Sequence, residues 1–324
     1  MTGCSWQLAI PEGEEGQMSY RQISPELQAI AQKNLNEDPK RRDEDIKHIK
    51  EWLKKQPHLK ARDDDQWILT FLRGCKFSLE KTKHKLDMFY TMRSALPEIF
   101  INRDPFSPIA QKYLNSAAVV QLPERDLEGR RVTLMRVGKL APGAFPPEEQ
   151  AKVDFMNGDA TLWEDDATVI CGEVIVQDMQ GATMAHFTAM SPWLMRRIMT
   201  CYQEAYPLRP KGFHVINSNP SLEKIFSFFE GFLKEKLKKR MFIHPNLESL
   251  YKHVPKKILP EEYGGEAGPI EKLQNMWKER IERNAAFFKE DEKYGVDESK
   301  RPGKPKTHTD LFGVEGSFRQ LSVD

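Results

Sequence analysis

The chain has 324 residues, and its 49 lysines and arginines almost balance its 48 aspartates and glutamates, for a formal net charge of +1. So small a charge excludes a molecule-wide field that would attract nucleic acid, so any electrostatic partner has to be met by a local patch. No apolar run approaches the roughly 20 residues that span a bilayer, and the start at Met1 has neither a basic signal region nor a glycine directly after it. We therefore expect a cytoplasmic protein with one large domain and a smaller one.

The four cysteines lie far apart, with no Cys-x-x-Cys pair and no histidine at metal-ligand spacing: Cys4, Cys75, Cys171 and Cys201. This spacing indicates free thiols in a reducing compartment and predicts no metal site.

The first part of the chain is polar and then helical. Residues 1–23 are rich in glycine and glutamate without periodicity, which is typical of a polar leader. Ser24 followed by Pro25 is typical of a helix start, and apolar residues then recur at helical spacing. Residues 24–98 are therefore predicted to form a small helical bundle, which serves as an N-terminal domain.

The period of the pattern changes in residues 105–268. Short β-branched runs begin at Val132, Val174 and Phe213, and helical stretches separate them. Strands that alternate with helices predict an α/β fold, with a mainly parallel twisted sheet covered by helices. One amphipathic helix is expected within residues 269–290, followed by a linker and an apolar C-terminal tail over residues 291–324.

The common catalytic motifs of α/β proteins are absent from the sequence, including glycine-rich phosphate loops and the Gly-x-Ser-x-Gly elbow. Glu164, Asp165 and Asp166 could be a paired-carboxylate site, but adjacent acids on a helix point in different directions, and we interpret them as a solvated turn. Three isolated histidines are interpreted as structural: His186, His214 and His244. We expect a protein without enzymatic activity and without a cofactor.

Two ordered stretches resemble a known family. Residues 63–78, DDDQWILTFLRGCKFS, resemble the helical domain that precedes CRAL-TRIO (Sec14-like) lipid-binding domains. Asp178-Met179-Gln180-Gly181 is similar to the core of that family, as are the later stretches 206–217 and 259–265. The likeness covers roughly residues 24–290 and is closest in style to the branch of alpha-tocopherol transfer protein and cellular retinaldehyde-binding protein.

The resemblance implies a ligand pocket between a sheet floor and a mobile helical lid. Side chains alternate along the strand 173–178, so Ile175 and Gln177 share one face. The resemblance to the family implies that this face lines the cavity. Gln177 replaces a usually apolar residue, which indicates either a ligand with one polar end or an amide bonded only to backbone. The other walls are expected to be Phe155, Ile198, Cys201, Tyr202, Tyr206, Phe213, Ile225, Phe229, Phe232 and Leu233.

The resemblance also implies a lid hinge at Gly231 and a phosphoinositide site at Lys211, Lys236 and Arg240, positions where related transfer proteins bind that lipid. Lys236 and Arg240 are four residues apart and share a helix face. At ~1 kcal/mol for each cation near an anionic leaflet, the local basic cluster suits a transient visit to a membrane. The alternative is a solvated helix end whose cations are favoured by the helix dipole.

The expected function is therefore that of a soluble, monomeric carrier. It would bind one hydrophobic lipid, similar to a tocopherol, retinoid or carotenoid, and exchange it transiently with membranes with phosphoinositide-assisted docking. The alternative is an adaptor that presents a phosphoinositide or signals with the same fold. Neither reading involves nucleic acid, and the sequence leaves the lipid itself open.

Overall fold

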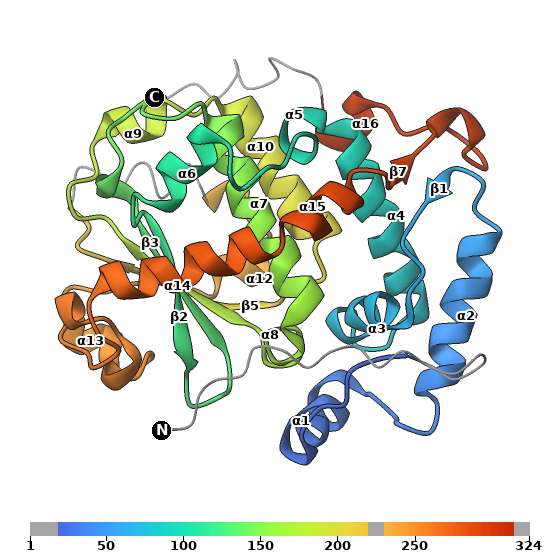
Figure 1. The fold of residues 1–324 in the computed structure, drawn as a ribbon, viewed down its shortest axis with the longest axis horizontal. Helices are drawn as coiled ribbons and strands as arrows, with labels where there is room; N and C mark the ends of the chain where they lie inside the picture. Colours follow the sequence, from blue (N-terminus) through green and yellow to red (C-terminus); the bar gives the residue numbers. More distant parts are fainter. Residues whose placement is uncertain (1–18, 220–229, 314–324) are drawn as a thin grey trace.

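One five-stranded sheet lies in the middle of the chain, with a bundle of helices beside it and helices on both of its faces (Figure 1). The computed structural model describes residues 19–219 and 230–313. The strand order is β2-β3-β4-β5-β6. The strands are β2 (Val119–Arg125), β3 (Arg131–Arg136), β4 (Glu173–Asp178), β5 (Pro210–Ile216) and β6 (Met241–Ile243).

The sheet is mainly parallel, which confirms the predicted fold class. β2 runs antiparallel to β3, whereas β3, β4, β5 and β6 pair in parallel. Such parallel pairs need long crossover connections, and helices supply them here. The crossovers contain α7 (Pro147–Glu164), α8 (Asp166–Cys171), α9 (Met184–Thr188), α10 (Pro192–Thr200), the π-helical turn η2 (Cys201–Ala205) and α12 (Glu235–Lys238), and the short 3-10 turn η1 (Val137–Lys139) follows β3.

The N-terminal helices form a bundle, and local signals set where they begin. The Ser24 hydroxyl accepts a hydrogen bond from the amide of Leu27, and the Asp64 carboxylate accepts one from the amide of Trp67. Both contacts satisfy amides that have no partner within the helix. The helices are α1 (Pro25–Leu35), α2 (Arg42–Lys54), α3 (Asp65–Gly74), α4 (Leu79–Ala95), α5 (Pro97–Phe100) and α6 (Pro108–Leu114).

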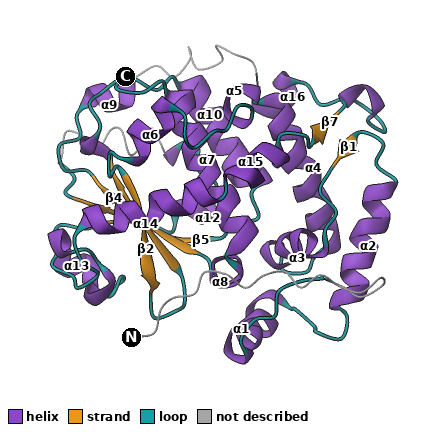
Figure 2. Ribbon diagram, viewed as in Figure 1, coloured by secondary structure: helices purple, strands orange, loops and turns teal. Residues whose placement is uncertain are grey.

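One face of the sheet is fully buried under the segment that follows β6. Val174 and Val176 of β4 are 1% and 0% exposed and belong to one apolar cluster with Leu250 and Leu273. Figure 2 shows α14 crossing this face. The covering elements are α13 (Leu247–Tyr251), η4 (Lys256–Ile258), η5 (Glu261–Tyr263) and α14 (Ile270–Arg283).

The single helix expected within residues 269–290 is two helices, because α14 ends before Asn284 and α15 (Ala285–Asp291) follows. The Asn284 side-chain amide donates to the carbonyl of Arg280 at 2.9 Å and to Glu164 at 3.2 Å, so it binds backbone and side-chain acceptors at the junction. The chain then returns to the helical bundle. Its elements are β7 (Gly295–Val296), which pairs with β1 (Leu59–Lys60), then η6 (Glu298–Lys300) and α16 (His308–Phe312), which packs on α10.

The interpretation of Glu164, Asp165 and Asp166 as a solvated turn is wrong. Asp165 and Asp166 are 5% and 9% exposed, and each accepts hydrogen bonds from arginine side chains. Burial alone would raise the pKa of Asp165, but neighbouring arginines outweigh it and hold that pKa well below its usual value. These acids join distant elements of the fold and are ion-paired structural residues.

A second buried ion cluster joins the helical bundle to α7 and α15. Arg93 of α4 donates to Asp159 of α7 at 2.7 Å and to Asp291 of α15 at 2.9 Å. Arg103 also donates to Asp291, at 2.7 Å, and forms an ion pair with Asp159. The Tyr206 hydroxyl donates to the other Asp159 oxygen at 2.6 Å. Two guanidinium groups thus balance two carboxylates inside the protein.

Replacing Asp159 by alanine should destabilise the whole chain, because two buried guanidinium groups would each lose one of their two carboxylate partners and Tyr206 would lose its acceptor. We expect a loss of about 3–5 kcal/mol in the free energy of unfolding, measured by urea titration. Glu80→Ala is the control, since the side chain of Glu80 in its pair with Lys83 is 83% exposed. That change should cost less than about 1 kcal/mol. Equal losses for the two variants would show that the buried cluster contributes no special stability.

Candidate functional site

The second face of the sheet differs from the first. Ile175 and Gln177 of β4 are half-buried, although their neighbours on the opposite face are completely buried. Strand pairing places further side chains on the Ile175 face: Thr133 and Met135 from β3, and Phe213 and Val215 from β5. Apolar walls with a few polar groups are typical of small-molecule sites. This face is therefore the candidate ligand-binding surface.

The sequence left two roles open for the Gln177 amide: a bond to a polar end of the ligand, or bonds to backbone alone. Within residues 19–219 and 230–313, its side chain makes no hydrogen bond, to backbone or to another side chain. An amide on an apolar wall is costly unless it is paired. Gln177 therefore remains able to bind a polar group of a ligand.

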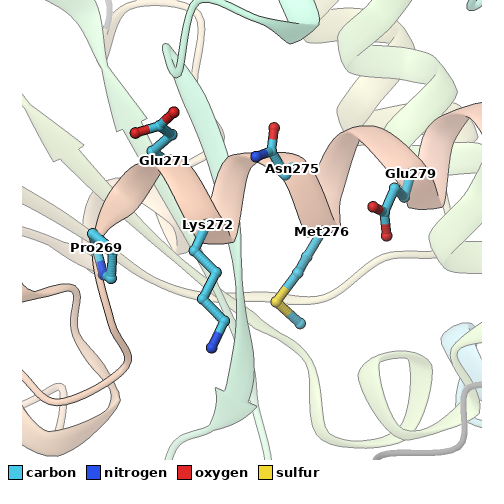
Figure 3. A pocket seen from close by; sticks show the side chains of 6 residues that line it. All are labelled: Pro269, Glu271, Lys272, Asn275, Met276 and Glu279. Carbon is cyan, nitrogen blue, oxygen red and sulfur yellow. The ribbon is translucent and has the colours of Figure 1, made fainter.

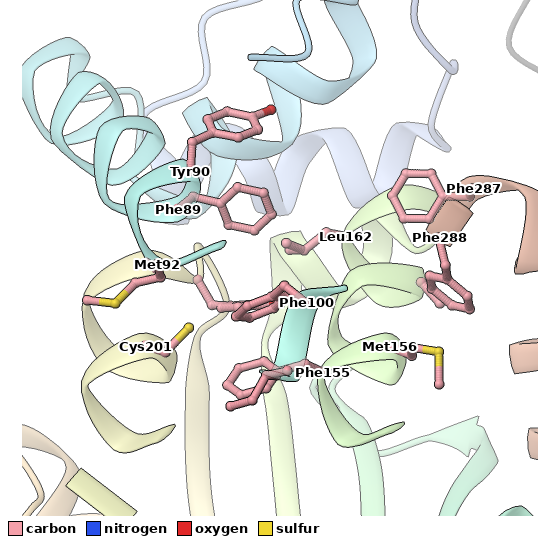
Figure 4. Packing of buried hydrophobic residues seen from close by; sticks show 14 of the residues in the cluster. Phe89, Tyr90, Met92, Phe100, Phe155, Met156, Leu162, Cys201, Phe287 and Phe288 are labelled. Atoms are coloured by element: carbon pink, nitrogen blue, oxygen red, sulfur yellow. The ribbon is translucent and has the colours of Figure 1, made fainter. Parts of the chain in front are cut away.

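The expected wall residues fall into two groups. Ile198 and Tyr202 lie on α10 and η2 and are half-buried, as is Phe213. Phe155, Cys201 and Tyr206 instead lie in the core between α4, α5 and α7, as Figure 4 shows for Phe155 and Cys201. The Phe155 ring lies 5.2 Å from that of Phe100 and 5.1 Å from that of Tyr206. Of these residues, Phe213 belongs to the sheet and Tyr202 bonds to Glu173 of β4, whereas Ile198 packs against the same core as Phe155, Cys201 and Tyr206.

The lid can be followed only in part, because Ile225 and Phe229 lie outside the described residues. Gly231 is exposed, and Phe232 and Leu233 after it are half-buried. The Gln203 amide of η2 donates to the carbonyl of Phe232 at 2.8 Å, and its oxygen accepts from the amide of Lys234 at 2.9 Å. This end of the lid segment is thus attached to η2.

A basic cluster stands beside this segment. Partial burial, followed by nearby cations, lowers the pKa of Lys211, and the same causes lower that of Lys236. No carboxylate of the described residues forms an ion pair with Lys211, Lys236 or Arg240. The cations that act on one another are Lys76, Lys81, Arg209, Lys211, Lys236 and Arg240, which we call the basic cluster.

Half of the basic cluster was absent from the sequence-based prediction. Lys76 and Lys81 belong to the helical bundle, and Arg209 lies just before β5. No sequence spacing connects residues so far apart. The adjacent basic residues Arg209 and Lys211 in the stretch 206–217 were the one local signal for Arg209.

The histidines and cysteines considered from the sequence have structural surroundings. The rings of His214 and His244 bond to each other at 2.8 Å, and His186 contacts the carbonyl of Leu140 at 2.8 Å. Cys75, Cys171 and Cys201 are free and buried. In the described part of the chain, no group of three or more histidine, cysteine or acidic residues could hold a metal ion, and no helix is long and apolar enough to cross a membrane.

A pocket of about 370 Å³ lies on the exposed side of α14 (Figure 3). Its lining is mostly charged or polar, with Met276 37% exposed. It stands on the outer side of the helix that covers the fully buried sheet face. An open, charged surface of this kind offers little apolar contact to a lipid.

Two family models match this chain. Residues 38–110 match the model of the Pinta-like UBA domain, and residues 115–265 match that of the CRAL/TRIO domain. The second match spans the sheet, its half-buried face and the basic segment. The chain therefore carries a CRAL-TRIO domain over residues 115–265. This domain is that of a lipid-binding and lipid-transfer family.

Relatives of this CRAL-TRIO chain are similar over most of its length. Alpha-tocopherol transfer protein-like of Mus musculus is 29% identical over 251 residues, 77% of this chain and 72% of that protein. Clavesin-2 of Homo sapiens is 25% identical over 284 residues, 87% of this chain and 85% of that protein. The structure titled "Crystal structure of Sfh5" has 12% identity and a TM-score of 0.49, and it covers 82% of this chain and 99% of that one.

Replacing Ile198, a half-buried residue of α10 that the sequence predicted as a pocket wall, by tryptophan should fill the pocket and lower the amount of bound lipid. We expect the lipid-to-protein ratio, measured by organic extraction and mass spectrometry, to fall at least about threefold, since added volume in a packed site displaces its occupant. Met276→Trp, on the exposed side of α14, is the matched control and should keep the full ratio. A folded Ile198→Trp protein with an unchanged ratio would contradict this position for the pocket.

Replacing Gln177 by leucine should weaken the binding of retinol far more than that of its deoxy hydrocarbon analogue. The loss for retinol should be roughly tenfold in Kd, the effect of one hydrogen bond in a buried site, measured by fluorescence titration. Met135→Leu is the control, because Met135 pairs with Gln177 across the strands and has no hydrogen-bonding amide. Equal losses for both ligands would reduce Gln177 to a packing residue.

Proposed function

We propose that this CRAL-TRIO protein is a soluble, monomeric carrier that holds one hydrophobic lipid against the Ile175 face and exchanges it with membranes. The observation that supports this most is the contrast between the two faces of β4. Val174 and Val176 are completely buried, whereas Ile175 and Gln177 are half-buried and the Gln177 amide has no hydrogen-bond partner among the described residues. The name of the relative alpha-tocopherol transfer protein-like supports a tocopherol-like cargo. A retinoid or carotenoid would satisfy the same surface.

The basic cluster supports phosphoinositide-assisted docking at a membrane. Six cations near an anionic leaflet would contribute roughly 6 kcal/mol, which is enough for a transient visit and too little for residence. The protein would thus be cytoplasmic and peripheral at membranes. Its near-neutral total charge provides no overall attraction for nucleic acid.

The backbone connects the basic cluster to the candidate ligand surface. Arg240 lies between α12 and β6, and its carbonyl accepts a hydrogen bond from the amide of Phe213 at 2.8 Å. The Phe213 side chain lies on the Ile175 face. A head group that pulls on Arg240 would therefore shift a strand of the ligand surface. Together with a hinge at Gly231, this link would let docking and lid opening occur as one event.

A second function uses the same surfaces differently. An adaptor would bind a phosphoinositide at the basic cluster and hold its lipid for another protein, without moving it between membranes. A transfer assay between donor and acceptor vesicles distinguishes the two, because only a carrier raises the rate at which lipid appears in the acceptor. Catalysis on the bound lipid forms no part of the proposal, and recovery of chemically unaltered lipid after incubation would agree with that.

The double change Lys236→Ala with Arg240→Ala should slow lipid transfer to vesicles that contain phosphoinositide by roughly ten- to thirtyfold, since about 2 kcal/mol of attraction is lost. Transfer to neutral vesicles should change less, and the Kd for lipid should stay nearly constant. Raising the ionic strength should reproduce the effect, because salt screens exposed charges over ~8–10 Å.

Lys252→Ala with Lys257→Ala is the matched control, since it removes the same charge from the exposed surface near α13. This control should transfer lipid at the normal rate. Rates that respond neither to the Lys236 and Arg240 changes nor to vesicle charge would exclude the docking role and leave an ordinary basic surface.

A further inference from the structure

An acid and a tyrosine meet at the beginning of the central strand. Glu173 is the first residue of β4, and the alternation of the strand places it on the same face as Ile175 and Gln177. Its Oε1 accepts a hydrogen bond from the Tyr202 hydroxyl at 2.5 Å. Tyr202 lies in η2, the turn to which the end of the lid segment is attached. The pair therefore belongs to the two elements that flank the candidate ligand surface.

Glu173 is buried without a cation. It is 9% exposed, and no lysine, arginine or histidine of the described residues lies within ion-pair distance of its carboxylate. Its partner across the strands, Arg131, directs its guanidinium to Asp165 at 3.0 Å. Burial raises the pKa of Glu173, and it raises that of Tyr202 as well. A buried acid without a countercharge is costly to a fold, so its presence needs an explanation.

One oxygen of the acid remains available. Oε1 is bonded to Tyr202, whereas Oε2 accepts no hydrogen bond from any residue in 19–219 or 230–313. Asp165 and Asp166 are different, because their oxygens are bonded to arginines, threonine or glutamine. Glu173 thus has the property of a binding group: it is held in place by one partner, and its second oxygen has none.

We propose that Glu173 and Tyr202 bind a hydroxyl group at one end of a hydrophobic cargo, so that this chain selects lipid alcohols over their esters and hydrocarbons. This inference rests on the carrier function proposed above and adds the chemical class of the cargo. A hydroxyl fits the pair in either protonation state, because it donates to a carboxylate and accepts from a carboxylic acid. An ester can only accept, and its added bulk has to fit beside a buried acid.

The position of the pair also separates it from Gln177. The two residues are four positions apart on one strand, which corresponds to about 13 Å at ~3.3 Å per residue. Ile175 lies between them on the same face. An apolar body would therefore cross Ile175, with the hydroxyl at Glu173 and any second polar group at Gln177.

The test measures the Kd of the full-length protein for two alcohols and their esters: retinol and retinyl acetate, and α-tocopherol and α-tocopheryl acetate. The variants are Glu173→Leu, Glu173→Gln and Tyr202→Phe. The control is Tyr113→Phe, since Tyr113 makes a similar bond to an acid, Asp154 at 3.0 Å, between α6 and α7 rather than to a residue of the sheet. Thermal unfolding of every variant shows whether it is folded.

The wild-type protein should bind at least one of the alcohols at least about tenfold more tightly than its ester. Glu173→Leu and Tyr202→Phe should remove that preference by weakening the alcohol alone, whereas Glu173→Gln should keep part of it and Tyr113→Phe all of it. Folded variants that retain the full preference, or that lose alcohol and ester equally, would overturn the inference. If Glu173→Leu does not fold, Tyr202→Phe and Glu173→Gln decide by the same criterion.

The same measurements keep the two proposals apart. A wild-type protein that binds none of the four probes and yields no lipid on organic extraction would overturn the carrier function itself. A wild-type protein that binds the esters as tightly as the alcohols would leave the carrier function standing and remove only the role of Glu173 and Tyr202.

Discussion

The arrangement of this chain depends on charges that are balanced inside it. Arg93 and Arg103 share Asp159 and Asp291, and these four residues come from separate parts of the sequence that meet only in the folded state. Removing such charges from water costs several kcal/mol each, and only their mutual attraction and hydrogen bonds recover that cost. The cluster therefore favours one relative position of the helical bundle and the sheet domain, because any displacement would separate buried partners.

This fixed frame holds a sheet whose two faces differ in burial. The face under α14 is packed like any protein core, with Val174 and Val176 completely buried. The opposite face of the same strand carries Glu173, Ile175 and Gln177, an order of polar, apolar and polar side chains that a core would not need. A rigid frame thus supports one surface whose side chains are incompletely packed and paired. Such a surface can bind a molecule that is not part of the chain.

Local features of this protein could be predicted from the sequence, and distant ones could not. Ser24 and Pro25 set the start of α1 through contacts within four residues, and the runs at Val132 and Val174 became β3 and β4. The face shared by Ile175 and Gln177 followed from strand alternation alone. Asp165 was misread because its arginine partner, Arg131, lies 34 residues away, and no periodicity reveals such a pair.

The candidate site shows the same division. Lys236 and Arg240 are neighbours on one segment, but Lys76 reaches the basic cluster from another domain, and only the folded structure shows it. Glu173 was overlooked because an acid at the start of a strand is usually solvated, and its bond to Tyr202 spans 29 residues. Phe155 and Cys201 fit the apolar pattern of a wall and were instead packed into the core, since composition does not distinguish a cavity lining from an interior.

The long separation between Arg93 and its partner Asp291 also has a consequence for synthesis. The two residues are 198 positions apart, and Phe287 and Phe288 complete the same apolar cluster as Trp67 and Phe89. On the ribosome, the helical bundle emerges first, and Arg93 can meet Asp159 once α7 has been made but can meet Asp291 only after α15 has left the exit tunnel. The charge cluster is therefore complete only when nearly the whole protein has been made, so the N-terminal helices gain this part of their stability late in translation.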